Sequence, residues 1–196
     1  TTFGWGVDDA EAWPHELERA LGVPVYNAGI PGHSTEQGRR VAPNLFRAKP
    51  SLAILGWGLR DAQLTTTPDV ERRPPQFPRN TAVFRWLSSK LKAPVYRRGH
   101  RPRVSAERFK ENLKRIIAAA EVEGVQVMLL DMTERSETPS HAQVLADLDR
   151  PLVVPRLADS MYFKNDSIHL TPAGNRALAQ LLAPSVSALL SPESGD

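Results

Sequence analysis

The segment Ser51-Leu52-Ala53-Ile54-Leu55-Gly56 decides the fold that we expect for this chain. Its four central residues are all apolar, with no polar residue alternating between them. A strand of this kind is buried on both faces, which is typical of a parallel sheet covered by helices on each side. In such sheets ligands bind beyond the carboxyl ends of the strands. The residues that follow Leu55 are therefore the first place to look for a functional site.

Three further apolar runs are predicted as strands of the same sheet, at about residues 24–28, 125–130 and 152–154. Between and around them, apolar residues recur at helical spacing at about 10–21, 34–47, 105–123 and 172–190. Because strands and helices alternate along the chain, we predict an α/β fold. Its form is a three-layer α/β/α sandwich with a central parallel sheet.

The composition is that of an ordinary globular domain. The 196 residues are enough for one domain with a substantial core, and 41% of them are hydrophobic against 24% charged. The chain has no cysteine, which excludes disulfides and thiolate metal sites. No apolar run is long enough to span a bilayer.

The strongest catalytic signal is the stretch Asn165-Asp166-Ser167-Ile168-His169-Leu170-Thr171-Pro172-Ala173-Gly174. It places an acid three residues before a histidine, ahead of a turn and an apolar C-terminal helix. An acid beside one imidazole nitrogen leaves the other nitrogen to act as a base. Taken alone, the same pattern also fits a turn capped by Asp166 beside a surface histidine.

Four blocks of the sequence together resemble the SGNH (GDSL-type) hydrolases in their order and spacing. They are Thr2-Phe3-Gly4-Trp5-Gly6-Val7, Asn27-Ala28-Gly29-Ile30-Pro31-Gly32, Gly56-Trp57-Gly58-Leu59-Arg60-Asp61 and the Asp166 to Gly174 stretch. The resemblance covers nearly the whole chain except about residues 68–103. It implies the flavodoxin-like fold of that family and serine-dependent acyl transfer.

The resemblance also implies a catalytic serine immediately before Thr1, so we expect an N-terminally incomplete domain that begins one residue after its nucleophile. His169 would take the serine proton, and Asp166 would hold His169 in the useful tautomer. The backbone N–H of Gly29 and the side chain of Arg60 would form the oxyanion hole. Arg60 departs from the family pattern, which has asparagine there, and its guanidinium can serve either the oxyanion or an anionic substrate group. Thr1 with its own amine is a weaker alternative nucleophile.

Three further residues are candidates for the pocket wall. His33 directly follows the glycine block, and Trp5 and Trp57 lie within two of the blocks, although aromatic side chains near loops are often explained by packing alone. The remaining histidines are given no role, because they lie on a predicted helix surface or in polar segments: His15, His100 and His141. No pair has metal-ligand spacing, so neither a metal nor a cofactor is expected.

Most of the positive charge lies in residues 68–103. This segment has ten lysines and arginines against two acids, whereas the whole chain has a net charge of +3. Prolines interrupt it, and residues 81–91 between them place apolar side chains on one helical stripe. We expect either a solvated insertion that covers the sheet or a lid whose basic face meets an anionic substrate or membrane surface. No nucleic-acid motif accompanies the charge, so nucleic acid is not expected.

We therefore expect a single hydrolase domain over residues 1–196, with a basic insertion at about 68–103. The leading hypothesis is a serine esterase for small acyl or acetyl esters, carried on a carbohydrate or a lipid. An O-acyltransferase would use the same triad, and a non-catalytic binding domain is the alternative if the residue before Thr1 is not serine. The compartment stays unknown, cytoplasmic or exported, because no signal peptide is visible but one could precede Thr1.

Overall fold

The sheet at the centre of the molecule is parallel. The computed structural model describes residues 2–65, 101–133, 139–157, 159–164 and 168–191. Within these ranges the strand order is β1-β4-β5, with β1 at Leu52–Leu55, β4 at Gln126–Leu130 and β5 at Leu152–Val153. Leu52 lies opposite Gln126 and Leu129 lies opposite Leu152. The predicted strands at 51–56, 125–130 and 152–154 are confirmed.

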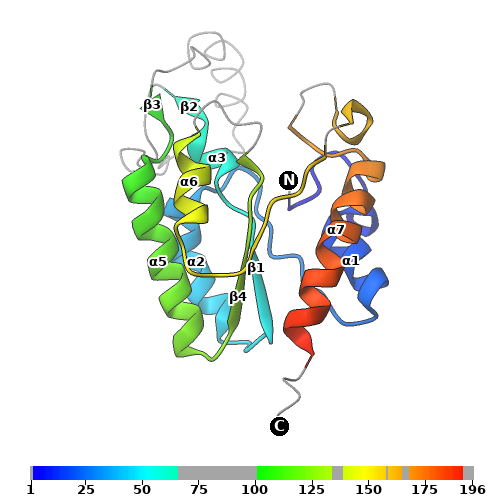
Figure 1. Ribbon diagram of the computed structural model, residues 1–196, viewed down its shortest axis with the longest axis horizontal. Helices are drawn as coiled ribbons and strands as arrows, with labels where there is room; N and C mark the ends of the chain where they lie inside the picture. The colour runs from blue at the N-terminus through cyan, green and yellow to red at the C-terminus, as the bar shows by residue number, and fades with distance from the viewer. Residues whose placement is uncertain (1, 66–100, 134–138, 158, 165–167, 192–196) are drawn as a thin grey trace, which may run out of the picture.

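Helices cover both faces of this sheet, as Figure 1 shows. One face carries α2 (Thr35–Phe46), α5 (Ala106–Val122) and α6 (Ser140–Ala146), and the other carries α1 (Trp13–Leu21) and α7 (Pro172–Leu190). Three of these helices begin at a capping residue, Ser34, Ser105 and Thr171. The side-chain oxygens of such residues accept hydrogen bonds from the first N–H groups of the helix.

Two groups of buried apolar side chains fill the two interfaces between sheet and helices. Strand β4 contributes to both, because successive side chains of a strand point to opposite faces. Val127 and Leu129 pack on the α2 and α5 side, whereas Met128 and Leu130 pack on the α1 and α7 side. The predicted three-layer α/β fold is confirmed, and both faces of β4 must be apolar because both are covered.

A two-stranded antiparallel ladder projects from one end of the sheet. Strand β2 (Leu64–Thr65) pairs with β3 (Arg101–Pro102), and Arg103 N–H donates to Gln63 O at 2.9 Å. The ladder therefore holds the two ends of the intervening segment side by side. Most of the predicted basic insertion lies outside the described residues, and its last residues belong to β3 and the turn after it.

The strand predicted at residues 24–28 is wrong, because no strand is assigned there. Exposure still alternates from residue to residue, with Val25 packed on the α1 and α7 side and Tyr26 83% exposed. Alternation follows from an extended chain, but a strand also needs a hydrogen-bonded neighbour. In the described part of the chain no ladder partner lies beside this segment.

None of the helices in the described residues has the length and apolar character needed to cross a membrane.

His141 was predicted to lie in a polar segment without a role, but the structure buries it. His141 lies on α6 and is completely buried. The centroid of its ring lies 4.9 Å from that of the Phe109 ring. Nε2 lies 2.9 Å from Val104 O and therefore carries the proton that it donates to this carbonyl. Burial lowers the pKa of His141 below its ordinary value of 6.5, against a smaller opposing effect of the Val104 hydrogen bond.

This lowered pKa predicts a stability that falls on mild acidification. The unfolded chain takes up the His141 proton as the pH falls below about 6.5, and the folded chain does so only at lower pH. Stability is thus fully present above pH 6.5 and is lost by at most about 1.4 kcal/mol per pH unit below it. Urea unfolding at several pH values should show this slope in the wild type and a smaller one in His141→Gln. His15→Gln, on the outside of α1, is the control, and an unchanged slope in His141→Gln would contradict the assignment.

Candidate active site

The N-terminal segment lies against the glycine block and the carboxyl end of β1. A Cβ atom at Gly29 would stand 2.6 Å from Phe3 N and 2.9 Å from the carbonyl carbon of Thr2, so only glycine fits beside this backbone. A Cβ atom at Gly56, just after β1, would lie 3.3 Å from Thr2 Oγ1. The first residues of the chain are therefore placed at the edge where parallel sheets bind ligands.

The glycine block forms a tight turn at the same edge. The N–H of Gly29 donates to Asn27 Oδ1 at 3.0 Å, so an oxyanion that used this donor would have to displace the asparagine side chain. Gly32 has a φ of +74°, a conformation that favours glycine. His33 follows, half-buried, and burial lowers the pKa of its imidazole. Its predicted place in the wall of the site stays a prediction.

Arg60 lies on α3 (Leu59–Ala62), a single turn that starts directly beyond the end of β1. Gly58 before it has a φ of +122°, and a Cβ atom there would stand 2.5 Å from Thr133 Cγ2. The guanidinium of Arg60 is half-buried and donates through Nη1 to Gln63 Oε1. Its Nη2 would lie 3.9 Å from a Cβ atom at Gly32. The structure thus brings Arg60 to the glycine block.

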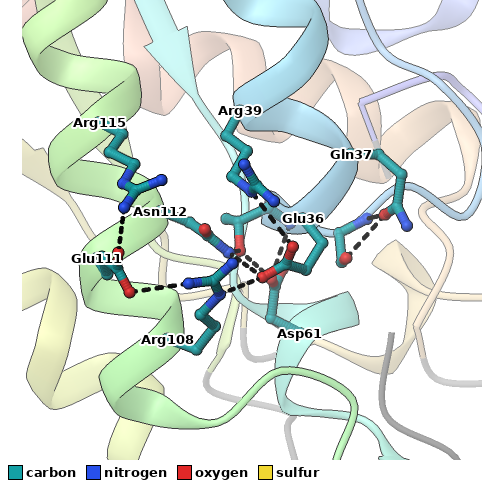
Figure 2. A network of polar contacts seen from close by, with 10 residues as sticks. Glu36, Gln37, Arg39, Asp61, Arg108, Glu111, Asn112 and Arg115 are labelled. Atoms are coloured by element: carbon teal, nitrogen blue, oxygen red, sulfur yellow. Dashed lines mark hydrogen bonds and ion pairs between the residues drawn. The ribbon is translucent and has the colours of Figure 1, made fainter. Parts of the chain in front are cut away.

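Asp61, the residue after Arg60, belongs to a buried polar network (Figure 2). Its Oδ1 accepts hydrogen bonds from the backbone N–H and the hydroxyl of Thr35, at 2.8 and 2.5 Å. Asn112 of α5 donates to Thr35 Oγ1 at 3.2 Å and to Glu36 Oε1 at 3.0 Å. Asp61 therefore caps α2 from another element and fixes α3 against it.

Glu36 is the charged centre of this network and is 3% exposed. Arg108 Nε approaches one of its oxygens at 2.6 Å and Arg39 Nε approaches the other at 3.2 Å. Burial alone would raise the pKa of the Glu36 carboxyl, but the hydrogen bonds from Arg108, Asn112 and Arg39 and the charge of Arg108 together lower it. The carboxylate stays ionised because two cations and an amide replace the water that it has lost.

His169 lies on a loop that closes against itself before α7. Lys164 N–H donates to His169 O at 2.8 Å, and Phe163 pairs with Leu170 as an antiparallel bridge. The ring of Trp5 lies 6.4 Å from the His169 ring between centroids, with the planes tilted by 38°. Because Lys164 Nζ also donates to Gly6 O, the N-terminal segment and the histidine loop are held together.

A second set of buried contacts anchors this loop to the helices. Asn175 of α7 accepts a hydrogen bond from Trp13 N–H at 3.0 Å, at the start of α1, and donates to Thr171 O at 3.0 Å. Thr171 Oγ1 donates to Met161 O at 2.9 Å, in the turn η4 (Ser160–Tyr162). A Cβ atom at Gly174 would stand 2.1 Å from Tyr162 O. These contacts therefore fix the histidine loop against the N-terminal end of α7.

The predicted site residues do not all meet. Gly29 touches the N-terminal segment, Trp5 of that segment lies beside His169, and Arg60 reaches Gly32 of the glycine block. Trp57 points to the opposite side, where its ring packs against Gly38 of α2, so it belongs to the core. Asp166 lies outside the described residues, and its predicted hydrogen bond to His169 stays a prediction.

A small hollow at the carboxyl end of the sheet was missed by the sequence analysis. It is lined by Leu59, Asp131, Met132, Pro155, Leu157, Phe163 and Ile168. Two of these residues directly neighbour Arg60 and His169 in the sequence. The signal that could have found it is Asp131, a polar residue directly after the apolar run of β4. Within the described ranges, no three His, Asp or Glu side chains gather closely enough to hold a metal ion.

The sequence model of the GDSL-like lipase/acylhydrolase family matches residues 1–177. The chain belongs to this family. It is a GDSL-like hydrolase that acts on ester bonds. A comparison with curated protein sequences gives no match.

Solved structures share the fold of this GDSL-like hydrolase. TesA superposes with a TM-score of 0.66 at 19% identity, covering 96% of this chain and 94% of TesA. The psychrotrophic esterase EstA from Pseudoalteromonas sp. has a TM-score of 0.65 at 14% identity, with 96% and 93% covered. AlinE4, an SGNH-hydrolase family esterase, has a TM-score of 0.56 at 19% identity, with 97% and 92% covered.

Glu36 and Glu111 both pair with Arg108, and we predict that their replacement lowers the stability of the fold by very different amounts. Glu36→Ala should lower the free energy of unfolding by about 3–5 kcal/mol, because it strands buried donors and a cation. Glu111→Ala removes only half-exposed pairs with Arg108 and Arg115 and should cost less than about 1 kcal/mol. Urea unfolding at neutral pH measures both. Equal losses in the two variants would show that burial does not govern these ion pairs.

Proposed function

We propose that this hydrolase cleaves small acyl esters, acetyl esters among them, through a serine immediately upstream of Thr1, with His169 as the base and Asp166 as its orienting acid. The observation that carries the proposal is the position of the N-terminal segment. Thr2 and Phe3 touch Gly29, Thr2 also approaches Gly56, and Trp5 lies beside His169. A nucleophile attached to this segment would stand between the glycine block and the histidine loop.

The proposed reaction is acyl transfer in two steps. His169 removes the serine proton as the serine oxygen attacks the ester carbonyl, and then gives that proton to the leaving alcohol. Water repeats the attack on the acyl-enzyme and releases the acid. The negative oxygen formed in each step needs donors aimed at it, and the guanidinium of Arg60 and the N–H of Gly29 are the candidates.

The experiment uses the chain extended upstream of Thr1 to include the preceding residue. We expect it to hydrolyse 4-nitrophenyl acetate and to be inactivated by a phosphonate ester. Its phosphonyl adduct should appear on the serine before Thr1 by mass spectrometry. The Pseudoalteromonas esterase structure was likewise obtained inhibited by monoethylphosphonate. Transfer of the acyl group to an added sugar in preference to water would identify an acyltransferase. If the protein shows no turnover and forms no adduct, the alternative of a non-catalytic binding domain is favoured.

The orienting role of Asp166 gives a quantitative prediction. Asp166→Asn leaves a side chain of the same shape but favours the wrong tautomer of His169, so kcat should fall by about 10⁴-fold. The measurement is ester hydrolysis by the extended chain, with the exposed Asp159→Asn as a matched control. A variant that keeps the wild-type rate would show that Asp166 only supports the loop.

Arg60 can be tested by comparing a neutral with an anionic ester. If Arg60 stabilises the oxyanion, Arg60→Ala should lower kcat on both by about 10²–10³-fold, which is the usual loss for one oxyanion donor. If it binds an anionic substrate group instead, the loss should appear in KM for the anionic ester alone. Gln63→Ala, which removes its hydrogen-bond partner, is the control for indirect effects. Unchanged kinetics on both esters would remove Arg60 from the site.

A further inference from the structure

Asp131 is a buried acid in an otherwise apolar place. It follows the last residue of β4 and is 6% exposed. Among the described residues that line the hollow, it alone has a side chain with polar oxygen or nitrogen atoms. A buried carboxylate is costly unless donors or cations replace its lost water.

Only half of this carboxylate is satisfied by the protein. Oδ1 accepts hydrogen bonds from Thr133 N–H at 2.7 Å and from Thr133 Oγ1 at 2.5 Å. Within the described residues, no donor bonds to Oδ2 and no cation forms a salt bridge with Asp131. The second oxygen is therefore able to accept a hydrogen bond from a group that enters the hollow.

Two residues that line the hollow are next in the chain to residues proposed for catalysis. Leu59 and Ile168, which line it, directly neighbour Arg60 and His169 in the chain. The hollow and these residues share the carboxyl edge of the sheet, where parallel sheets bind ligands. A group that binds Asp131 is therefore expected to belong to the same ester.

The size and lining of the hollow restrict the class of that group. Its volume of about 20 Å³ is enough for one water-sized group. An ammonium would bring three N–H donors, whereas the described side chains of the hollow offer one carboxylate oxygen to accept them. A hydroxyl brings a single donor and fits that oxygen.

We propose that Asp131 is a specificity-determining residue that selects esters with a hydroxyl group near the ester carbonyl, by accepting a hydrogen bond from it through Oδ2. This rests on the proposed function for the reaction itself. It adds a substrate class, short hydroxylated esters, to a site that would otherwise accept any small acyl ester.

Two matched pairs of esters test the preference in the extended wild-type chain. The acyl pair is 4-nitrophenyl 3-hydroxybutyrate and 4-nitrophenyl butyrate, and the alcohol pair is glycerol monobutyrate and propyl butyrate. Each kcat/KM is divided by the rate constant for hydroxide-catalysed hydrolysis, which removes differences in intrinsic reactivity. We expect the hydroxylated ester to be preferred by roughly 10-fold in one pair, from a hydrogen bond to a charged acceptor. That pair identifies the half of the substrate that enters the hollow, and no preference in either pair overturns the proposal.

Asp131→Asn is the decisive variant. Its amide oxygen can still accept from Thr133, which leaves the amide N–H₂ facing the hollow and removes the charge. The preference should fall by roughly 10-fold or more, while hydrolysis of the butyrate without the hydroxyl is kept. Asp149→Asn, at an exposed acid after α6, should change neither. An equal loss on both members of a pair would show a structural role and overturn the proposal.

A binding measurement separates this proposal from the proposed function. Met132 lines the hollow, whereas Met128 is completely buried in the core. With ¹³C-methyl methionine, 3-hydroxybutyramide should shift the Met132 signal at lower concentration than butyramide, and Asp131→Asn should abolish that difference. Met128 is the internal reference. If no ester is hydrolysed but this difference is seen, the reaction is wrong and the role of Asp131 stands. Equal shifts with both amides overturn the role of Asp131.

Discussion

The buried carboxylate of Asp61 is the constraint on which the arginine side of the site depends. It accepts the first N–H group of α2 and the Thr35 hydroxyl, so α3 cannot move without uncapping a helix. The backbone of Arg60, one residue earlier, is therefore held in place. Since α5 reaches the same cap through Asn112, the placement of Arg60 depends on three helices and not on β1 alone.

The histidine side is built in the same way from different residues. Asn175 accepts the N–H of Trp13 and donates to Thr171 O, so it joins the start of α1 to the end of the histidine loop. In both places a polar side chain that is almost fully buried caps a helix belonging to another element. Hydrogen bonds between buried polar groups favour one geometry. The two halves of the site are thus each held by a contact between helices, on opposite faces of one sheet.

Much of this architecture could be predicted from the sequence, because the signals are local. The apolar runs at 52–55 and 126–130 mark strands covered on both faces, and Ser34 and Thr171 mark helix starts. The strand predicted at residues 24–28 was wrong, because alternating exposure of side chains indicates an extended chain and does not show that a neighbouring strand pairs with it. His141 and Asp131 also escaped prediction. His141 stands in a polar stretch with no local sign of burial, because its burial arises only when distant Val104 packs against it. Asp131 had a local sign, its place directly after the apolar run of β4, but the hollow beside it forms only when distant segments such as Phe163 pack there.

The close contacts of the glycines have a consequence for engineering. Side chains at Gly29, Gly58 and Gly174 would collide with backbone or core atoms at 2.6, 2.5 and 2.1 Å, so randomising these codons would mostly yield misfolded clones. The hollow is different, because Met132, Phe163 and Ile168 are half-buried or exposed and can change in size. A directed-evolution library that leaves the three glycines untouched and varies these three positions would place its diversity where the scaffold tolerates it.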